Sequence, residues 1–154
     1  MKKSMKWLGA LALMIMCAMT FTACGSDDDG DGGGGSTGGS YVGEWVYVQS
    51  SGDDAYYVEV LKLNSNGTGT DTWYYLSEDE SIYEDSNFTY SVSGNQITVK
   101  TPEGTLTGNY SMGTYDDSQY LAITLNGSTT TYMKMTSEIR SVINSFNPKR
   151  GDLH

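Results

Sequence analysis

The feature that most constrains this chain is an alternation of apolar and polar residues, with a period of two, that recurs between residues 41 and 135. It is clearest in the stretches 88–92, 97–99, 106–112 and 121–125. Such alternation turns one side of an extended segment toward a dry interior and the other toward water. The pattern therefore predicts half-buried β-strands over most of the chain.

Residues that favour tight turns separate these stretches. Asn66-Gly67, Gly94-Asn95, Glu103-Gly104 and Asn126-Gly127 tolerate the positive φ angles that hairpin turns need. Because short turns join neighbouring strands antiparallel, we expect a series of linked hairpins. Eight strands are predicted, near residues 43–49, 56–63, 68–75, 87–93, 95–101, 104–112, 119–125 and 128–135.

Eight hairpin-linked strands favour an all-β fold, an eight-stranded antiparallel up-and-down barrel. Closure into a barrel removes the exposed sheet edges that invite association. A barrel of this size has an interior that side chains fill or that holds one small ligand. A β-sandwich is the alternative, but sandwiches usually need long crossovers, and only the connections 76–86 and 113–118 exceed a few residues.

The segment after the last predicted strand carries a helical pattern. Apolar residues recur at i, i+3, i+4 and i+7 from Ile139 to Phe146, and Asn147-Pro148 ends the pattern. The first two predicted strands are apolar on both faces, so their outer face needs a cover. We therefore predict a short C-terminal helix, beginning near Ser137, that lies against the outside of the barrel; a frayed tail is the alternative.

The first residues have the features of a signal peptide. Lys2, Lys3 and Lys6 precede an apolar run from Trp7 to Phe21, which predicts a signal peptide over residues 1–23. A transmembrane anchor is the alternative reading, but the run is shorter than the roughly 20 residues that span a bilayer. We therefore exclude this segment from the fold.

The predicted cleavage site points to a lipid anchor. Phe21-Thr22-Ala23-Cys24-Gly25 resembles the bacterial lipobox, whose cysteine becomes the lipidated first residue of the mature chain. Several acyl chains, at about 0.8 kcal/mol per buried CH₂, hold a protein firmly on a membrane. A structural thiol is the alternative for Cys24, but a lone cysteine can form no disulfide within the chain.

Residues 24–40 predict a solvated tether, because they are acidic and rich in Gly and Ser and cannot bury apolar surface. Ser26 and the acidic residues after it also resemble the export signal of surface lipoproteins in certain Gram-negative bacteria. The expected localisation is the outer membrane, at the cell surface, with the membrane as partner through the anchor. We divide the rest into a barrel domain over 41–135 and a C-terminal helix and tail over 136–154.

The mature chain holds few groups for site chemistry. Once the leader is removed and Cys24 is acylated, no free thiol remains, and the one histidine is His154 at the chain end. Nucleophilic catalysis, structural zinc and haem usually need such groups. We expect no catalytic residue, no metal and no cofactor, and hence no enzyme.

Charge narrows the partners further. Residues 24–154 carry six basic against nineteen acidic side chains, a net charge of −13, so we expect no binding of nucleic acid. We also expect a monomer. The acidic loops at 53–54, 78–85 and 116–117 could supply oxygen ligands for calcium, or a carboxyl pair for glycoside hydrolysis. None has EF-hand spacing, and solvated loops explain them more simply.

Four segments together resemble the lipocalin-like domains of bacterial surface lipoproteins. They are Gly43-Glu44-Trp45, 61–68, 90–98 and 132–134, and the similarity spans about 41–135. In lipocalins a Gly-x-Trp begins the first strand and its indole packs across one end of the barrel. The resemblance implies that role for Trp45 and a small barrel with a helix after its eighth strand; many members have no known activity.

Aromatic residues suggest where a ligand would bind. All twelve tyrosines lie within 41–135, and rings with hydroxyl groups suit the lining of a barrel end. We therefore expect binding of a small apolar or aromatic ligand. The alternative is a structural or accessory module without a cavity, whose aromatic residues pack the core and whose outer face meets an envelope protein. The candidate ligand-binding residues are Trp45, Trp73, Tyr75, Phe88, Tyr90 and Tyr110.

The direction of the third predicted strand decides the setting of one acidic residue. If Trp73 and Tyr75 point inward, period-two alternation turns Asp71 inward as well. An inward carboxylate would be a polar contact for a ligand or a strained buried charge. An outward Asp71 would be solvated.

Overall fold

The computed structural model of the chain describes residues 41–51, 54–151 and 153. The predicted signal peptide over 1–23, the lipidation site at Cys24 and the tether over 24–40 lie outside the described residues. In the part that is described, no helix has the length and apolar character needed to cross a membrane.

Eight antiparallel strands form the domain, which confirms the predicted all-β fold. Each strand pairs with the next one in sequence, and β1 pairs with β8, so the hydrogen-bonded ring closes. The strands are β1 (Gly43–Ser50), β2 (Ala55–Leu63), β3 (Thr68–Ser77), β4 (Ser81–Ser93), β5 (Gln96–Thr101), β6 (Gly104–Tyr115), β7 (Ser118–Leu125) and β8 (Ser128–Lys134).

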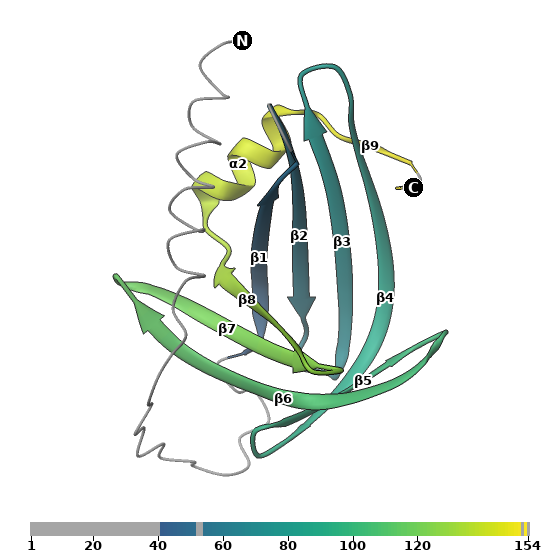
Figure 1. The fold of residues 1–154 in the computed structure, drawn as a ribbon, viewed down its shortest axis with the longest axis vertical. Coiled ribbons are helices and arrows are strands. Elements are labelled where there is room, and N and C mark those ends of the chain that lie inside the picture. The colour runs from purple at the N-terminus through teal and green to yellow at the C-terminus, as the bar shows by residue number, and fades with distance from the viewer. Residues whose placement is uncertain (1–40, 52–53, 152, 154) are drawn as a thin grey trace.

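The ring is lipocalin-like in shape, and its two halves run in different directions. Figure 1 shows β1 to β4 along the long axis, whereas β6 and β7 cross near the end where β2 turns into β3. The closing seam is short, because only Trp45↔Lys134 and Val46↔Met133 pair β1 with β8. The up-and-down order and this closure exclude the sandwich alternative.

Two connections that were predicted to be long are tight turns. β3 and β4 continue to pair as far as Leu76↔Ser81, and β6 and β7 as far as Tyr115↔Ser118. The stretch over 81–87 has Ile82 and Tyr83 side by side and is otherwise polar or acidic, so it lacks the apolar alternation by which the other strands were found. Backbone pairing with a neighbouring strand does not depend on that alternation, so the strands extend further than predicted.

The first apolar cluster, which we call the interior cluster, has members on six strands around the ring. Side chains from strands all around a closed ring can meet only inside it. Trp45, Leu63 and Leu121 have at most 2 % of their surface exposed. The interior cluster consists of Trp45, Leu61, Leu63, Tyr90, Ile97, Leu121, Ile123 and Tyr132.

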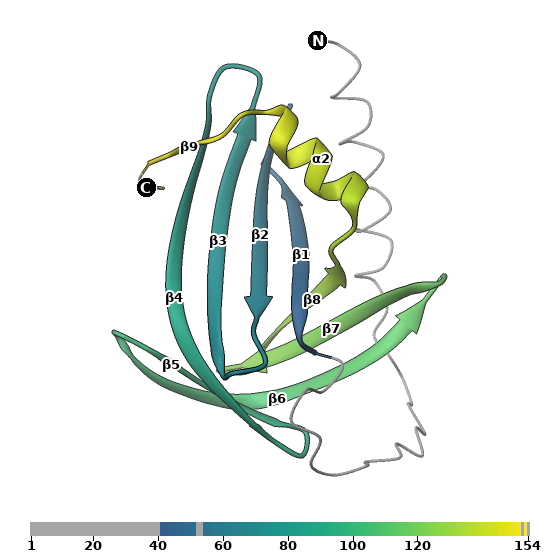
Figure 2. The same ribbon diagram turned by 180° about the vertical axis from the view of Figure 1, so that it is seen from behind.

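The second apolar cluster lies on the opposite face of β1 to β3, under the helix α2 (Ser137–Ser145). Figures 1 and 2 show α2 beside β1. The side chain of Thr136 caps the helix by accepting from the Ile139 N–H at 3.2 Å, and Arg140 forms an ion pair with Glu44 on β1. The predicted cover of the outer face is therefore confirmed. This helix-covered cluster consists of Val46, Val48, Val58, Val60, Leu76, Ile139 and Ile143.

A short ninth strand, β9 (Lys149–Arg150), follows the helix and was not predicted. It pairs in parallel with Ile82 and Tyr83 of β4. Arg150 also forms an ion pair with Asp85 at 2.6 Å. A stretch of two residues is too short to show a period in the sequence, so only the structure reveals this pairing.

Candidate functional site

The two ends of the barrel interior differ in how they are filled. At one end, which we call the packed end, Tyr41 lies edge-on to Tyr90 and Tyr110, with ring centroids 6.1 and 5.6 Å apart. The Trp45 indole donates to the Tyr41 carbonyl oxygen at 2.8 Å, and the Tyr90 hydroxyl donates to the Asn64 carbonyl oxygen at 2.5 Å. The Trp45 indole and the Tyr90 hydroxyl are thus both paired with backbone acceptors.

Lys134 covers the Trp45 ring at the packed end. Its ammonium nitrogen lies 4.5 Å from the ring centroid and donates to the Val42 carbonyl oxygen at 3.2 Å. Gly43 allows this approach, because a Cβ atom there would lie 2.4 Å from the Lys134 nitrogen, and its φ of 133° suits glycine alone. Gly43 and Trp45 of the Gly43-Glu44-Trp45 motif thus both serve packing: Gly43 leaves room for the Lys134 side chain that covers the Trp45 ring.

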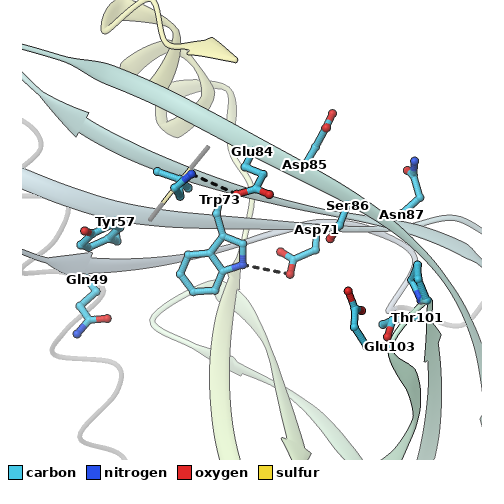
Figure 3. A pocket seen from close by; sticks show the side chains of 12 residues that line it. Gln49, Tyr57, Asp71, Trp73, Glu84, Asp85, Ser86, Asn87, Thr101 and Glu103 are labelled. Carbon is cyan, nitrogen blue, oxygen red and sulfur yellow. Dashed lines mark hydrogen bonds between the residues drawn. The ribbon is translucent and has the colours of Figure 1, made fainter. Parts of the chain in front are cut away.

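The other end of the interior opens into a cleft of about 900 Å³. The cleft lies between the inner faces of β1 to β4 and the turn that joins β5 to β6, and Figure 3 shows its side chains. Four of its twelve lining residues are acidic and none is basic. The lining residues that bear on its chemistry are Tyr57, Asp71, Trp73, Glu84, Ser86 and Glu103.

Aromatic rings form part of the cleft wall. The Trp73 ring stands in the cleft beside Asp71 in Figure 3, and its indole N–H donates to Asp71 Oδ2 at 3.2 Å. Tyr57 lies in the same cleft, and its ring packs on that of Tyr75 with centroids 5.3 Å apart. The wall therefore offers apolar ring faces next to carboxylate oxygens.

A pair of carboxyl groups lies beneath this wall. Glu59 on β2 is only 7 % exposed and is the one buried charged side chain in the part of the chain that the structure describes. Its Oε1 accepts from the Tyr132 hydroxyl at 2.7 Å. The neighbouring carboxyl belongs to Asp71, whose Oδ1 is buried and accepts from no N–H or O–H group within hydrogen-bond range.

Burial changes the protonation of this carboxyl pair. Loss of solvent, and then the nearby charge of Asp71, raise the pKa of Glu59 to about 8. Burial also raises the pKa of Asp71, while hydrogen bonds from Trp73 and Glu59 oppose that rise. At neutral pH the pair therefore holds a proton, and a protonated Glu59 can donate it in a hydrogen bond to the Asp71 carboxyl.

Tyr132 completes the polar group beneath the cleft. Burial, and then the charge of Glu59, raise the pKa of its hydroxyl, so the phenol stays protonated and keeps its donor. Chemically, the pair holds a proton at neutral pH and places the Asp71 carboxyl at the cleft. Two carboxyls with one proton suit the binding of a donor or a cation.

The C-terminal residues contribute to the rim of the cleft. Leu153 lines it, and its backbone N–H donates to Glu84 Oε2 at 3.3 Å, a bond drawn in Figure 3. Gly151 N–H donates to the Tyr83 carbonyl oxygen at 3.0 Å. Arg150 pairs with Asp85, and no basic residue lines the cleft. The acidic side chains of Asp71, Glu84 and Glu103 therefore have no basic partner in the lining and are available to a ligand.

The structure divides the six residues that the sequence proposed as ligand-binding. Trp73 lines the cleft, and Tyr75 packs on Tyr57 beside it. The other four lie in or against the interior cluster, three of them at the packed end. These four are Trp45, Phe88, Tyr90 and Tyr110.

Sequence reasoning placed Asp71 conditionally and missed Glu59. The register Leu61↔Asp71 puts Asp71 on the inner face, with Trp73, as period-two alternation required. The same period links Glu59 to Leu61 and Leu63, which lie in the interior cluster. Period-two alternation therefore also predicts that Glu59 faces the interior. This prediction was missed because the strand has apolar residues on both faces.

Comparison with known proteins does not identify a family for this chain. No protein-family model matches the chain, and no curated protein matches its sequence. Across the described residues, no group of three or more His, Cys, Asp or Glu side chains is placed to hold a metal ion. The function must therefore be argued from the cleft itself.

Proposed function

We propose that this protein is a lipid-anchored lipoprotein of the outer membrane, exposed at the cell surface, whose barrel binds a small ligand with an aromatic or apolar body. The anchor is supported by the sequence around Cys24. The binding role is supported by the cleft of about 900 Å³, a volume within the range of small-molecule sites.

The contrast between the two ends is the observation that carries this proposal. A purely structural module would be packed throughout, as the end around Trp45 is. The other end instead combines ring faces of Trp73 and Tyr57 with carboxylates and other polar side chains, so it offers a ligand both apolar contact and hydrogen-bond partners. A binding role accounts for that opening, whereas the alternative of an interaction module without a cavity does not.

Native mass spectrometry of the full-length chain, purified from its membrane, tests the proposal. We expect one small molecule per chain, and a covalent lipid mass that the Cys24→Ser variant lacks. Ser86→Trp fills the cleft and should lose the ligand, because Ser86 lines it. Asp117→Asn, in the exposed β6–β7 turn where φ is 63°, is the matched control and should keep it.

Three results would count against parts of the proposal. An empty wild-type chain, or equal ligand occupancy in wild type and Ser86→Trp, would favour the interaction module. An unmodified Cys24 would overturn the anchor without affecting the binding role. The two parts are therefore tested separately in the same spectra.

A further inference from the structure

We propose that the ligand of the cleft carries a cationic group, an ammonium or a guanidinium, which lies against Trp73 among Asp71, Glu84 and Glu103. This inference rests on the proposed function, because it requires the cleft to be a ligand site. It adds the chemical class of the ligand, which neither the sequence nor the fold supplies.

The charge of the lining is the first argument. Of the twelve lining residues four are acidic and none is basic, and Arg150 pairs with only one of the four, Asp85. Carboxylates gathered in a concave, partly apolar site concentrate cations and repel anions. An anionic ligand would meet no compensating positive charge among the lining residues, so a cation is the charge type that fits.

The orientation of Trp73 is the second argument. Its indole N–H is engaged by Asp71 Oδ2 at 3.2 Å, so the ring edge is held at the carboxylate while the ring stands in the cleft. A cation over the face of an indole is attracted by the negative π-surface. The chain uses this contact at Trp45, where the Lys134 ammonium lies 4.5 Å from the ring centroid. Trp73 has no such partner among the described residues.

The buried carboxyl pair is the third argument, because it can respond to a cation. Positive charge near Asp71 favours the ionised form of both carboxyls. The titratable groups that face Glu59 are Asp71 on β3 and Tyr132 on β8, and neither carries positive charge. A bound cation would supply that charge, so binding should release a proton from Glu59.

Three probes of similar size and different charge test the inference by titration calorimetry. They are benzyltrimethylammonium, benzyl alcohol and benzoate, added to the full-length chain in lipid nanodiscs. We expect the cation to bind at least about tenfold more tightly than the alcohol, with benzoate the weakest. Titrations in two buffers of different ionisation enthalpy should show proton release near pH 7.5 with the cation alone.

Variants at exposed positions separate charge from folding. Glu84→Gln with Glu103→Gln should bring the affinity for the cation close to that for the alcohol, since both side chains line the cleft and are exposed. Trp73→Leu should lower the affinity for the cation more than the affinity for the alcohol. Asp117→Asn removes one carboxylate far from the cleft lining and should leave all three affinities unchanged.

The outcomes distinguish this inference from the proposed function. Equal affinities for cation and alcohol, or tighter binding of benzoate, would overturn the cationic class while the cleft remained a ligand site. Failure of all three probes, in a chain that still carries a neutral co-purified ligand, would also overturn only the inference. Failure of all three in a chain that purifies empty would overturn both.

Discussion

Trp45 and Trp73 both lie inside the ring, on β1 and β3, but at opposite ends and with different partners. Trp45 has none of its surface exposed, and its indole N–H donates to the neutral carbonyl oxygen of Tyr41. Trp73 is partly exposed in the cleft, and its N–H donates to a carboxylate, Asp71. One residue type therefore serves two different environments in the same barrel.

The difference teaches how this barrel separates stability from function. A backbone carbonyl is an acceptor that must be paired anyway, so the packed end gains from burying Trp45. A buried carboxyl pair such as Glu59 and Asp71 opposes folding through desolvation. Perturbed acids of this kind concentrate at functional sites. The cleft end, where burial of these carboxyls opposes folding, is thus the end at which we expect a ligand.

The largest expected effect is on stability at the packed end. Trp45→Ala should lower the free energy of unfolding by about 3–5 kcal/mol, because it empties a fully buried site. Trp73→Ala should cost less than about 2 kcal/mol, because its ring already faces a cleft. Urea denaturation followed by circular dichroism measures both; similar losses would erase the distinction between the two ends.

The next effect is a pH dependence that arises at the cleft end. The pKa of Glu59 is raised to about 8 in the folded protein from an ordinary 4.5, so folding binds a proton between these values. Stability from this group is therefore fully present below about pH 4.5 and is lost as the pH rises through 8. Relative to Glu59→Gln, which stays neutral, wild type should lose about 3 kcal/mol of unfolding free energy between pH 5 and 8.5.

Denaturation of both chains at several pH values tests this expectation. Glu78→Gln, which removes an exposed carboxyl from the β3–β4 turn, is the control and should keep the wild-type pH dependence. Parallel curves for wild type and Glu59→Gln would show that the buried pair does not titrate as described. Burial of the carboxyl pair would then not distinguish the energetics of the cleft end from those of the packed end.

The smallest effect concerns tyrosine hydroxyls at the two ends. Tyr90→Phe should cost about 1 kcal/mol, because the Asn64 carbonyl oxygen loses a donor at 2.5 Å. Tyr57→Phe, on the cleft wall, should change stability by less than about 0.5 kcal/mol. Thermal or urea unfolding compares the two; a larger loss in Tyr57→Phe would mean that the cleft wall contributes to folding as the packed end does.

Local pattern predicted most of the strands and the helix correctly. Alternation over 88–92 and 121–125 located strands whose apolar residues lie inside, because each side chain's face follows from its neighbours in an extended chain. The outer apolar face of β1 and β2 correctly called for the cover that α2 provides. The ends of the strands were predicted less well, because residues 81–87 pair with β3 but do not alternate between apolar and polar side chains.

The site was predicted only in part. Trp73 and Asp71 were assigned to one face by parity, and both line the cleft. Trp45, with its indole and its lysine cover, belongs to the packed end, and composition alone does not separate these two tryptophans. Their difference depends on which neighbours the folded ring places beside each.

By itself the sequence determined the extended conformation, the two-residue alternation and the hairpin order, because these follow from interactions among near neighbours in the chain. Only the tertiary structure decided that Glu59, Asp71 and Tyr132 meet under an open cleft. Tyr132 is 73 residues from Glu59 in the chain, and the two meet only because strand register and the β1–β8 closure bring them together. Long-range register sets which side chains share a dielectric environment, and hence which acids keep their protons.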